Sequence, residues 1–233
     1  MKIIECPRDA MQGFSHFIST EKKIEYLNSL LKVGFDTIDA GSFVSPRIIP
    51  QMRDTEEVLQ SIDLKGSKSK LLTIIANTKG AEMAVKHNNV SYLGFPFSIS
   101  ETFQIRNTNS TIAQSFERVK YIHSLCRDNG KELVIYISMG FGNPYGDAWN
   151  TDVVDEWTEK MGELGINIIS LSDTVGVATP DSIAYLFSHL QKKYPQIEFG
   201  AHLHTRKDNW RERVEAAYEN GCTRFDGAIN GFG

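Results

Sequence analysis

The sequence predicts an α/β protein with the (β/α)8 TIM barrel fold. Short β-branched runs alternate with longer amphipathic segments, the joins between them are short, and the strand-like runs number eight. Alternation of this kind implies parallel strands, because parallel neighbours need a crossover connection. Eight such strands favour a closed barrel over an open, doubly wound sheet. We expect one catalytic domain over residues 1–233, since α/β barrels of this length often form a single unit.

Eight predicted strands give the order of the barrel. They are Ile3–Cys6, Thr37–Ala40, Leu71–Ala76, Tyr92–Phe97, Leu133–Met139, Asn167–Leu171, Glu198–His202 and Arg224–Ile229. Seven full helices are predicted between them, because apolar residues recur there at a spacing of 3.6. The clearest apolar faces are Ile24, Leu27, Leu30 and Leu31, then Phe116, Val119, Ile122 and Leu125, then Ile183, Leu186, Phe187 and Leu190.

Local signals mark where several helices begin and end. Ser19 and Thr179–Pro180 precede helical segments, where a capping hydroxyl and an early proline are favourable. Gly34, Gly165 and Gly221 each follow a helical segment, as helix-ending glycines do. The last strand runs into Asn230–Gly233, where the sequence stops. We therefore expect a C-terminally truncated barrel that lacks its last helix and the loop before it.

Composition indicates a small-molecule partner. The net charge is −4, and lysines and arginines are spread along the chain, so no basic stripe indicates nucleic-acid binding. No apolar run approaches the roughly 20 residues of a membrane helix, and the first residues show no signal-peptide pattern. Three widely spaced cysteines favour a reducing compartment. We expect a cytoplasmic protein that acts on neither membranes nor nucleic acids.

A TIM barrel places functional residues at the C-terminal ends of its strands, and polar residues follow the predicted strands here. Arg8 and Asp9 follow the first strand, where a carboxylate could bind a metal and an arginine could stabilise an oxyanion. The alternative is a surface turn with a local ion pair. Asp39 ends the second predicted strand, either as an active-site acid or as a helix cap.

His202 and His204 end the seventh predicted strand. Residues i and i+2 of a strand point to the same side, so both imidazoles could bind one ion. Two histidines and a carboxylate suit a divalent metal with positions open to substrate oxygens. The alternative is a chance pair on an exposed strand. Ser170–Thr174 ends the sixth strand, where Asp173 or Thr174 could instead be a turn or cap residue.

Four segments together resemble the 3-hydroxy-3-methylglutaryl-CoA lyases, a family of the metallolyase barrel superfamily that also contains isopropylmalate and homocitrate synthases. Pro7–Gln12 resembles the family's P-R-D-G-x-Q opening, and Ser42–Met52 is more typical of the lyases than of the synthases. Ser170–Gly176 resembles the S-L-x-D-T-x-G motif, and Ala201–His204 resembles the H-x-H motif. The resemblance runs nearly from end to end.

The resemblance implies a metal-dependent lyase that splits 3-hydroxy-3-methylglutaryl-CoA, an acyl-CoA, into acetoacetate and acetyl-CoA. It implies that Asp9, His202 and His204 bind Mg²⁺ or Mn²⁺, with a further asparagine ligand beyond the end of this sequence. Arg8 would stabilise the enolate oxygen. A homo-oligomer, either a dimer or a tetramer, is also expected.

Other site residues follow from the same resemblance. Gln12, Ser42, Ser170 and Asp173 would surround the substrate, and Asp39 stands where the family usually has glutamate. Either His202 or Asp173 would remove the proton from the tertiary hydroxyl, a contribution of roughly 10²–10⁴ in rate.

The sequence also departs from the family pattern. Ala10 replaces the usual glycine, and Thr205–Lys207 follows His204 where the family has Asp-Thr-x-Gly. A glycine-rich loop with a catalytic cysteine would begin at Gly231–Gly233, so we expect the chain as given to have little activity. Two alternatives stay open: a related synthase that joins acetyl-CoA to a 2-oxo acid, and a degenerate barrel without catalysis.

Overall fold

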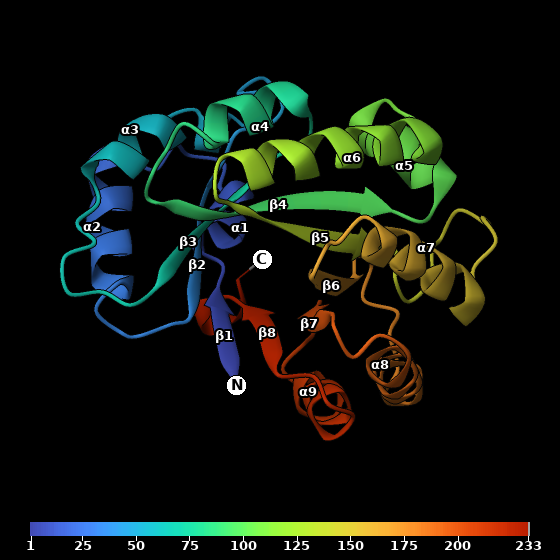
Figure 1. Cartoon of the computed structure of the whole chain (residues 1–233). Coiled ribbons are helices and arrows are strands. Elements are labelled where there is room, and N and C mark those ends of the chain that lie inside the picture. The colour runs from blue at the N-terminus through green and yellow to red at the C-terminus, as the bar shows by residue number, and fades with distance from the viewer. Residues whose placement is uncertain (233) are drawn as a thin grey trace. The chain divides into compact units, whose positions relative to one another are not determined.

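The computed structural model describes residues 1–232, so Gly233 of the predicted glycine-rich loop lies outside the described residues. The strands labelled in Figure 1 are β1 (Lys2–Glu5), β2 (Thr37–Ser42), β3 (Lys70–Ile74), β4 (Val90–Ser98), β5 (Glu132–Ser138), β6 (Ile168–Asp173), β7 (Glu198–Leu203) and β8 (Arg224–Gly227). The helices are α1 (Pro7–Gln12), α2 (Thr20–Leu30), α3 (Thr55–Ser61), α4 (Thr78–Ala84), α5 (Glu101–Thr108), α6 (Ile112–Asp128), α7 (Thr151–Glu163), α8 (Pro180–Lys193) and α9 (Trp210–Glu219). Two 3₁₀ segments, η1 (Pro50–Met52) and η2 (Ile229–Gly231), complete the order.

The strands form a closed barrel in the order β1 to β8, which confirms the predicted TIM barrel. Neighbouring strands pair in parallel. The longest register runs between β6 and β7, from Ile168 opposite Glu198 to Asp173 opposite Leu203. Every residue of β2 and of β6 is buried, as expected for parallel strands that are covered on both faces.

The chain divides into two compact units, which are described separately. One comprises residues 2–94, 124–132 and 226–233, and the other comprises Met1 with residues 95–123 and 133–225. The single domain over residues 1–233 stays a prediction.

In the unit that contains β1 to β3, the end of β2 is built around Gly41. A Cβ atom at this position would lie 2.6 Å from Cγ2 of Thr55 on α3, so only glycine fits without displacing that side chain. The closeness allows the Thr55 hydroxyl to accept a hydrogen bond from the Ser42 backbone N–H at 3.1 Å. The register with β3 also shifts between Asp39 and Gly41. The strand therefore continues to Ser42, two residues beyond its predicted end.

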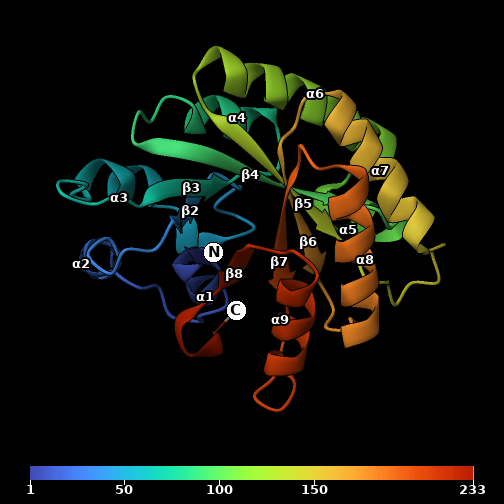
Figure 2. The ribbon, with the colours of Figure 1, turned by 60° about the horizontal axis from the view of Figure 1, so that its bottom comes forward.

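In the unit that contains β5 to β7, α8 begins with the predicted cap. The Thr179 hydroxyl accepts from the Ser182 backbone N–H and the Ser182 hydroxyl accepts from the Thr179 N–H, which makes a capping box. Ile183, Leu186, Phe187 and Leu190 are all fully buried, as the apolar spacing predicted. Helices α8 and α9 lie side by side (Figure 2), so α9, the helix that follows β7, packs against α8.

The prediction of seven helices is wrong, because residues 1–232 contain nine α-helices. The additional helices are α1 and α5, of six and eight residues. Neither is long enough to show an apolar period, and helices this short depend on tertiary contacts that spacing does not reveal. Ser100 caps α5 by accepting from the Phe103 N–H, and Asn109 ends it with a left-handed φ of 49°. The eighth strand is also shorter than predicted, since η2 begins at Ile229.

Within residues 1–232, no helix has both the length and the apolar character that a membrane span requires.

Candidate functional site

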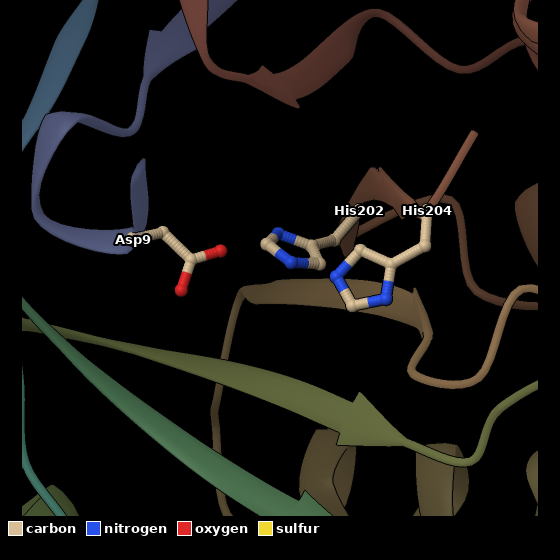
Figure 3. A group of neighbouring side chains, drawn as sticks. All are labelled: Asp9, His202 and His204. Carbon is tan, nitrogen blue, oxygen red and sulfur yellow. The ribbon is translucent and has the colours of Figure 1, made fainter. Parts of the chain in front are cut away.

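Three side chains predicted as metal ligands come together. Asp9, on α1 directly after β1, and His202 and His204, at the end of β7, each offer a ligand atom, and these atoms lie within 4.8 Å of one another. Figure 3 draws these three side chains as sticks. Two histidines and one carboxylate form a donor set that suits a divalent metal.

The ring orientation of His204 is fixed by a hydrogen bond. Its Nδ1 lies 3.1 Å from the carbonyl oxygen of Thr174, which follows β6. A carbonyl can only accept, so Nδ1 carries the proton and Nε2 keeps the lone pair that a metal requires. The Thr174 hydroxyl in turn accepts from the Met139 backbone N–H at 2.8 Å. The His202 ring packs edge-on against Tyr136, with ring centroids 5.7 Å apart.

Arg8 is the centre of a buried polar network beside Asp9. Its Nη1 donates to Asp9 and to the Gln12 side chain, both at 2.8 Å, while Nε and Nη2 contact one Asp39 oxygen at 2.9 and 2.7 Å. The Arg8 residue is only 8% exposed and lies on α1, so the surface turn of the alternative interpretation is wrong, while the local Arg8–Asp9 ion pair that it expected is present. Burial alone would lower the pKa of Arg8, but Asp39 and Asp9 outweigh that effect and raise it. The guanidinium therefore stays charged.

Asp39 lies inside β2 rather than at its end, which corrects the predicted position. Its side chain is 2% exposed. Burial raises the pKa of Asp39 to about 6, although the positive charge of Arg8 opposes the rise. At neutral pH Asp39 is therefore largely ionised and neutralises Arg8. The contacts from Asp39 hold the Arg8 guanidinium in place next to Asp9.

Asp173 is completely enclosed at the end of β6. One oxygen accepts from the Val177 N–H at 2.8 Å, both lie 3.1 Å from the Ala178 N–H, and Arg213 of α9 lies 3.2 Å from Oδ2. The alternative interpretation of Asp173 as a turn-forming residue is therefore supported by its contacts. Its oxygens are occupied by donors that shape the loop between β6 and α8.

Besides Asp173, three residues were predicted to surround the substrate. Gln12 accepts from Arg8 through Oε1. The hydroxyl of Ser42, a buried residue, accepts from the Val44 N–H at 3.2 Å. Ser170 is fully buried on β6, with its hydroxyl oxygen 3.2 Å from where a Cβ of Gly200 would stand. Substrate contact by these residues stays a prediction.

Sequence reasoning missed Arg213, which contacts Asp173 and the backbone carbonyl of His204. It lies on a helix with several charged residues, and nothing in the spacing distinguishes it from Arg211, which pairs with Glu215 at the surface. Thr174 was noted only as part of a motif and as a possible turn or cap residue. The role of its carbonyl depends on the fold and not on the side chain.

Comparisons with known proteins agree with this geometry. The HMGL-like family model matches residues 2–233. The mitochondrial hydroxymethylglutaryl-CoA lyase of Macaca fascicularis is 33% identical over 236 residues, covering all of this chain and 71% of the relative. The Bacillus subtilis hydroxymethylglutaryl-CoA lyase is 29% identical over 227 residues, covering 97% of this chain and 75% of the relative.

Solved structures are also similar. An HMG-CoA lyase from Acinetobacter baumannii, in complex with coenzyme A and 3-methylmalate, has a TM-score of 0.92 and 34% identity over all of this chain and 75% of that one. The carboxyl transferase domain of Rhizobium etli pyruvate carboxylase has a TM-score of 0.74 at 16% identity over 98% of this chain and 40% of that one, which shows the shared fold alone. The family match over residues 2–233, together with relatives above 30% identity, shows that the chain belongs to the HMGL-like family.

Proposed function

We propose that the protein is a divalent-metal-dependent carbon–carbon lyase that cleaves 3-hydroxy-3-methylglutaryl-CoA into acetoacetate and acetyl-CoA. The observation that carries this proposal is the grouping of Asp9, His202 and His204 within 4.8 Å, in a chain whose relatives are named as lyases of this substrate. The complex of a 34% identical lyase with coenzyme A supports an acyl-CoA substrate.

We propose Mg²⁺ or Mn²⁺ as the cation. The residues fit such an ion, because Nε2 of His204 is left for coordination by the bond from Nδ1 to Thr174. A bound divalent cation would add positive charge that acidifies a hydroxyl and polarises an oxygen of the substrate.

We propose that Arg8 stabilises negative charge. A guanidinium has five N–H donors, and four are used in the contacts to Asp9, Gln12 and Asp39, which leaves one Nη2 hydrogen. When the C2–C3 bond of the substrate breaks, its electron pair moves into the thioester and forms an enolate, whose carbon takes up one proton to give acetyl-CoA and so balances the proton lost from the hydroxyl. The electrons of the former O–H bond form the ketone of acetoacetate. The remaining Arg8 N–H would donate to the enolate oxygen, a form of stabilisation that is typically worth several kcal/mol.

His202 is the better of the two predicted proton acceptors. Asp173 accepts from Val177, Ala178 and Arg213, and its side chain is fully buried. His202, at the end of β7, is only half-buried and is therefore more accessible to a substrate. A ring nitrogen that binds a cation cannot accept a proton, so one nitrogen of His202 serves one role at a time. A His202→Asn variant separates the two roles. Weaker Mn²⁺ binding would indicate a ligand, and unchanged binding with a lower kcat would indicate a base.

The decisive experiment incubates the full-length protein with 3-hydroxy-3-methylglutaryl-CoA and Mg²⁺ while acetoacetate is measured. We expect cleavage by the wild type and by His189→Ala, a matched control in which a histidine paired with Asp155 on α7 is removed. We expect no cleavage by His204→Ala.

Two other outcomes would replace the proposal. Condensation of acetyl-CoA with a 2-oxo acid, followed as released thiol, would indicate a synthase. A failure to bind Mn²⁺ in calorimetric titration, together with no cleavage, would indicate a barrel without catalysis. The proposed homo-oligomer is tested by light scattering after size-exclusion chromatography. The proposed cytoplasmic location is tested by fractionation of cells that produce the full-length protein.

A further inference from the structure

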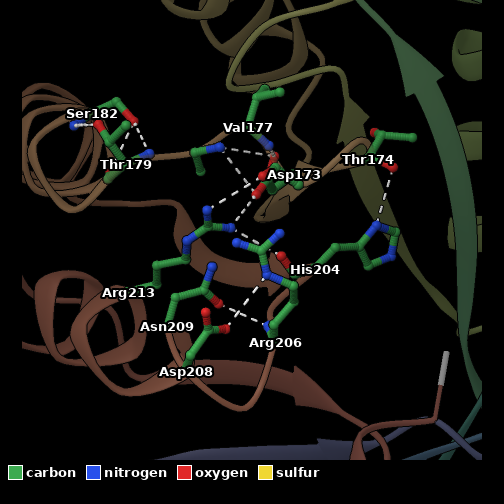
Figure 4. A network of polar contacts seen from close by, with 12 residues as sticks. Asp173, Thr174, Val177, Thr179, Ser182, His204, Arg206, Asp208, Asn209 and Arg213 are labelled. Atoms are coloured by element: carbon green, nitrogen blue, oxygen red, sulfur yellow. Dashed lines mark hydrogen bonds and ion pairs between the residues drawn. The ribbon is translucent and has the colours of Figure 1, made fainter.

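We propose that Arg213 is a positioning residue for the metal ligand His204. The inference rests on the proposed function, because it takes His204 to be a ligand. Figure 4 shows Arg213 reaching from α9 into a polar network that contains Asp173, Val177, Thr174 and His204. Its side chain is only 11% exposed.

Arg213 holds the backbone of His204 directly. The last register pair of β7 with β6 joins Leu203 to Asp173, so His204 stands one residue beyond the paired strand. Its carbonyl accepts from Nη1 of Arg213 at 3.0 Å. His204 and the four residues after it, up to residue 208, are exposed. The contact to Arg213 therefore replaces the support that a strand partner would give.

Arg213 also holds the loop that orients the His204 ring. Its Nη1 lies 3.2 Å from Oδ2 of Asp173, and its Nη2 donates to the Gly176 carbonyl at 3.3 Å. These two residues flank Thr174, whose carbonyl accepts from Nδ1 of His204. One guanidinium thus fixes both the main chain of the ligand and the acceptor of its ring hydrogen.

The chemistry of the contacts requires an arginine. Asp173 is fully buried, and a fixed positive charge beside it offsets the cost of burying a carboxylate. The three acceptors on Asp173, Gly176 and His204 are reached from two nitrogens of one planar group. A lysine ammonium keeps the charge, but it is a single point donor and cannot hold the same three acceptors in that geometry.

The test compares Mn²⁺ affinity by calorimetric titration in the full-length protein and three variants. Arg213→Met removes the charge and all three contacts, and Arg213→Lys keeps the charge. Arg211→Met is the matched control, because Arg211 lies on the same helix, is 76% exposed and pairs with Glu215. Loss of an outer partner of a metal ligand commonly weakens metal binding 10–100-fold. We expect a loss in that range for Arg213→Met, a smaller loss for Arg213→Lys and no change for Arg211→Met.

A urea unfolding series on the metal-free proteins separates positioning from general stability. If the folded Arg213 variants bind Mn²⁺ as tightly as the wild type while unfolding at lower urea, Arg213 is only structural and the proposal is overturned. If Arg213→Met does not fold, Arg213→Lys decides the question by the same comparison. Failure of the wild type itself to bind Mn²⁺ would overturn the metal site and this inference together. Tight binding by all variants would overturn the inference alone.

Discussion

Replacing Gly41 with alanine should destabilise the protein by about 2–5 kcal/mol. The new Cβ would lie 2.6 Å from Cγ2 and 3.0 Å from Oγ1 of Thr55, so the threonine must move. Overpacking of this kind costs about 1–3 kcal/mol. The Thr55 hydroxyl accepts from the Ser42 N–H and donates to the Met52 carbonyl, and each buried hydrogen bond contributes about 1 kcal/mol. A gain of about 0.4–1 kcal/mol from the stiffer unfolded chain offsets part of the loss.

Urea unfolding measures this free energy, and two further variants make the reasoning specific. Gly13→Ala is the control, because a Cβ there meets no atom within 4 Å, and it should be neutral or slightly stabilising. Thr55→Ser removes the methyl group at 2.6 Å but keeps the hydroxyl, so the Gly41→Ala/Thr55→Ser double variant should recover about half of the loss. A Gly41→Ala cost below about 0.5 kcal/mol, or no recovery in the double variant, would refute the steric account.

Three further predictions concern charge and chemistry. Burial raises the pKa of Cys126 to about 12, so very little of the reactive thiolate is present at pH 8. Iodoacetamide should therefore alkylate Cys126 roughly 10³-fold more slowly in the folded protein than in urea. Equal rates would contradict this prediction. Hydrogen bonds from Ser100 and Thr102 lower the pKa of Asp147, so its contribution to stability is present above about pH 4 and is lost as the pH falls further. The stability advantage of wild type over Asp147→Asn, measured by urea unfolding from pH 6 to pH 3, should therefore shrink, and a growing advantage would rule out this assignment. Asp9→Asn keeps the shape of the side chain but removes a charged ligand, so Mn²⁺ binding should weaken strongly in calorimetry, and unchanged affinity would exclude Asp9 from the site.

The grouping of the three candidate metal ligands could be predicted because it follows from local rules. His202 and His204 share a side of one strand by the two-residue period, and Asp9 follows β1 closely enough for the barrel to bring it to the same end. Neither conclusion required knowledge of which distant side chains touch. The same rules placed the strand cores and the Thr179 cap correctly.

Pairings between distant residues could not be predicted. Asp39 was taken as the end of a strand because it directly follows an apolar run, yet Arg8, 31 residues away, neutralises it and β2 continues to Ser42. Arg213 and Asp173 are 40 residues apart and meet only once α9 is packed. The helix α1 was missed for a related reason, since six residues hold a helix only with such tertiary support.

The ion pairs Arg8–Asp39 and Arg213–Asp173 share an arrangement that has a consequence for metal binding. In each, a strand aspartate that is almost fully buried neutralises an arginine, and that arginine also contacts a predicted metal ligand: Arg8 contacts Asp9, and Arg213 contacts His204. An uncompensated guanidinium beside such a residue would repel a cation. Since Asp39 and Asp173 offset the two arginine charges, the negative charge of Asp9 is left for a cation. A divalent ion bound there would retain about one positive charge, which is the polarity needed to attract an anionic substrate.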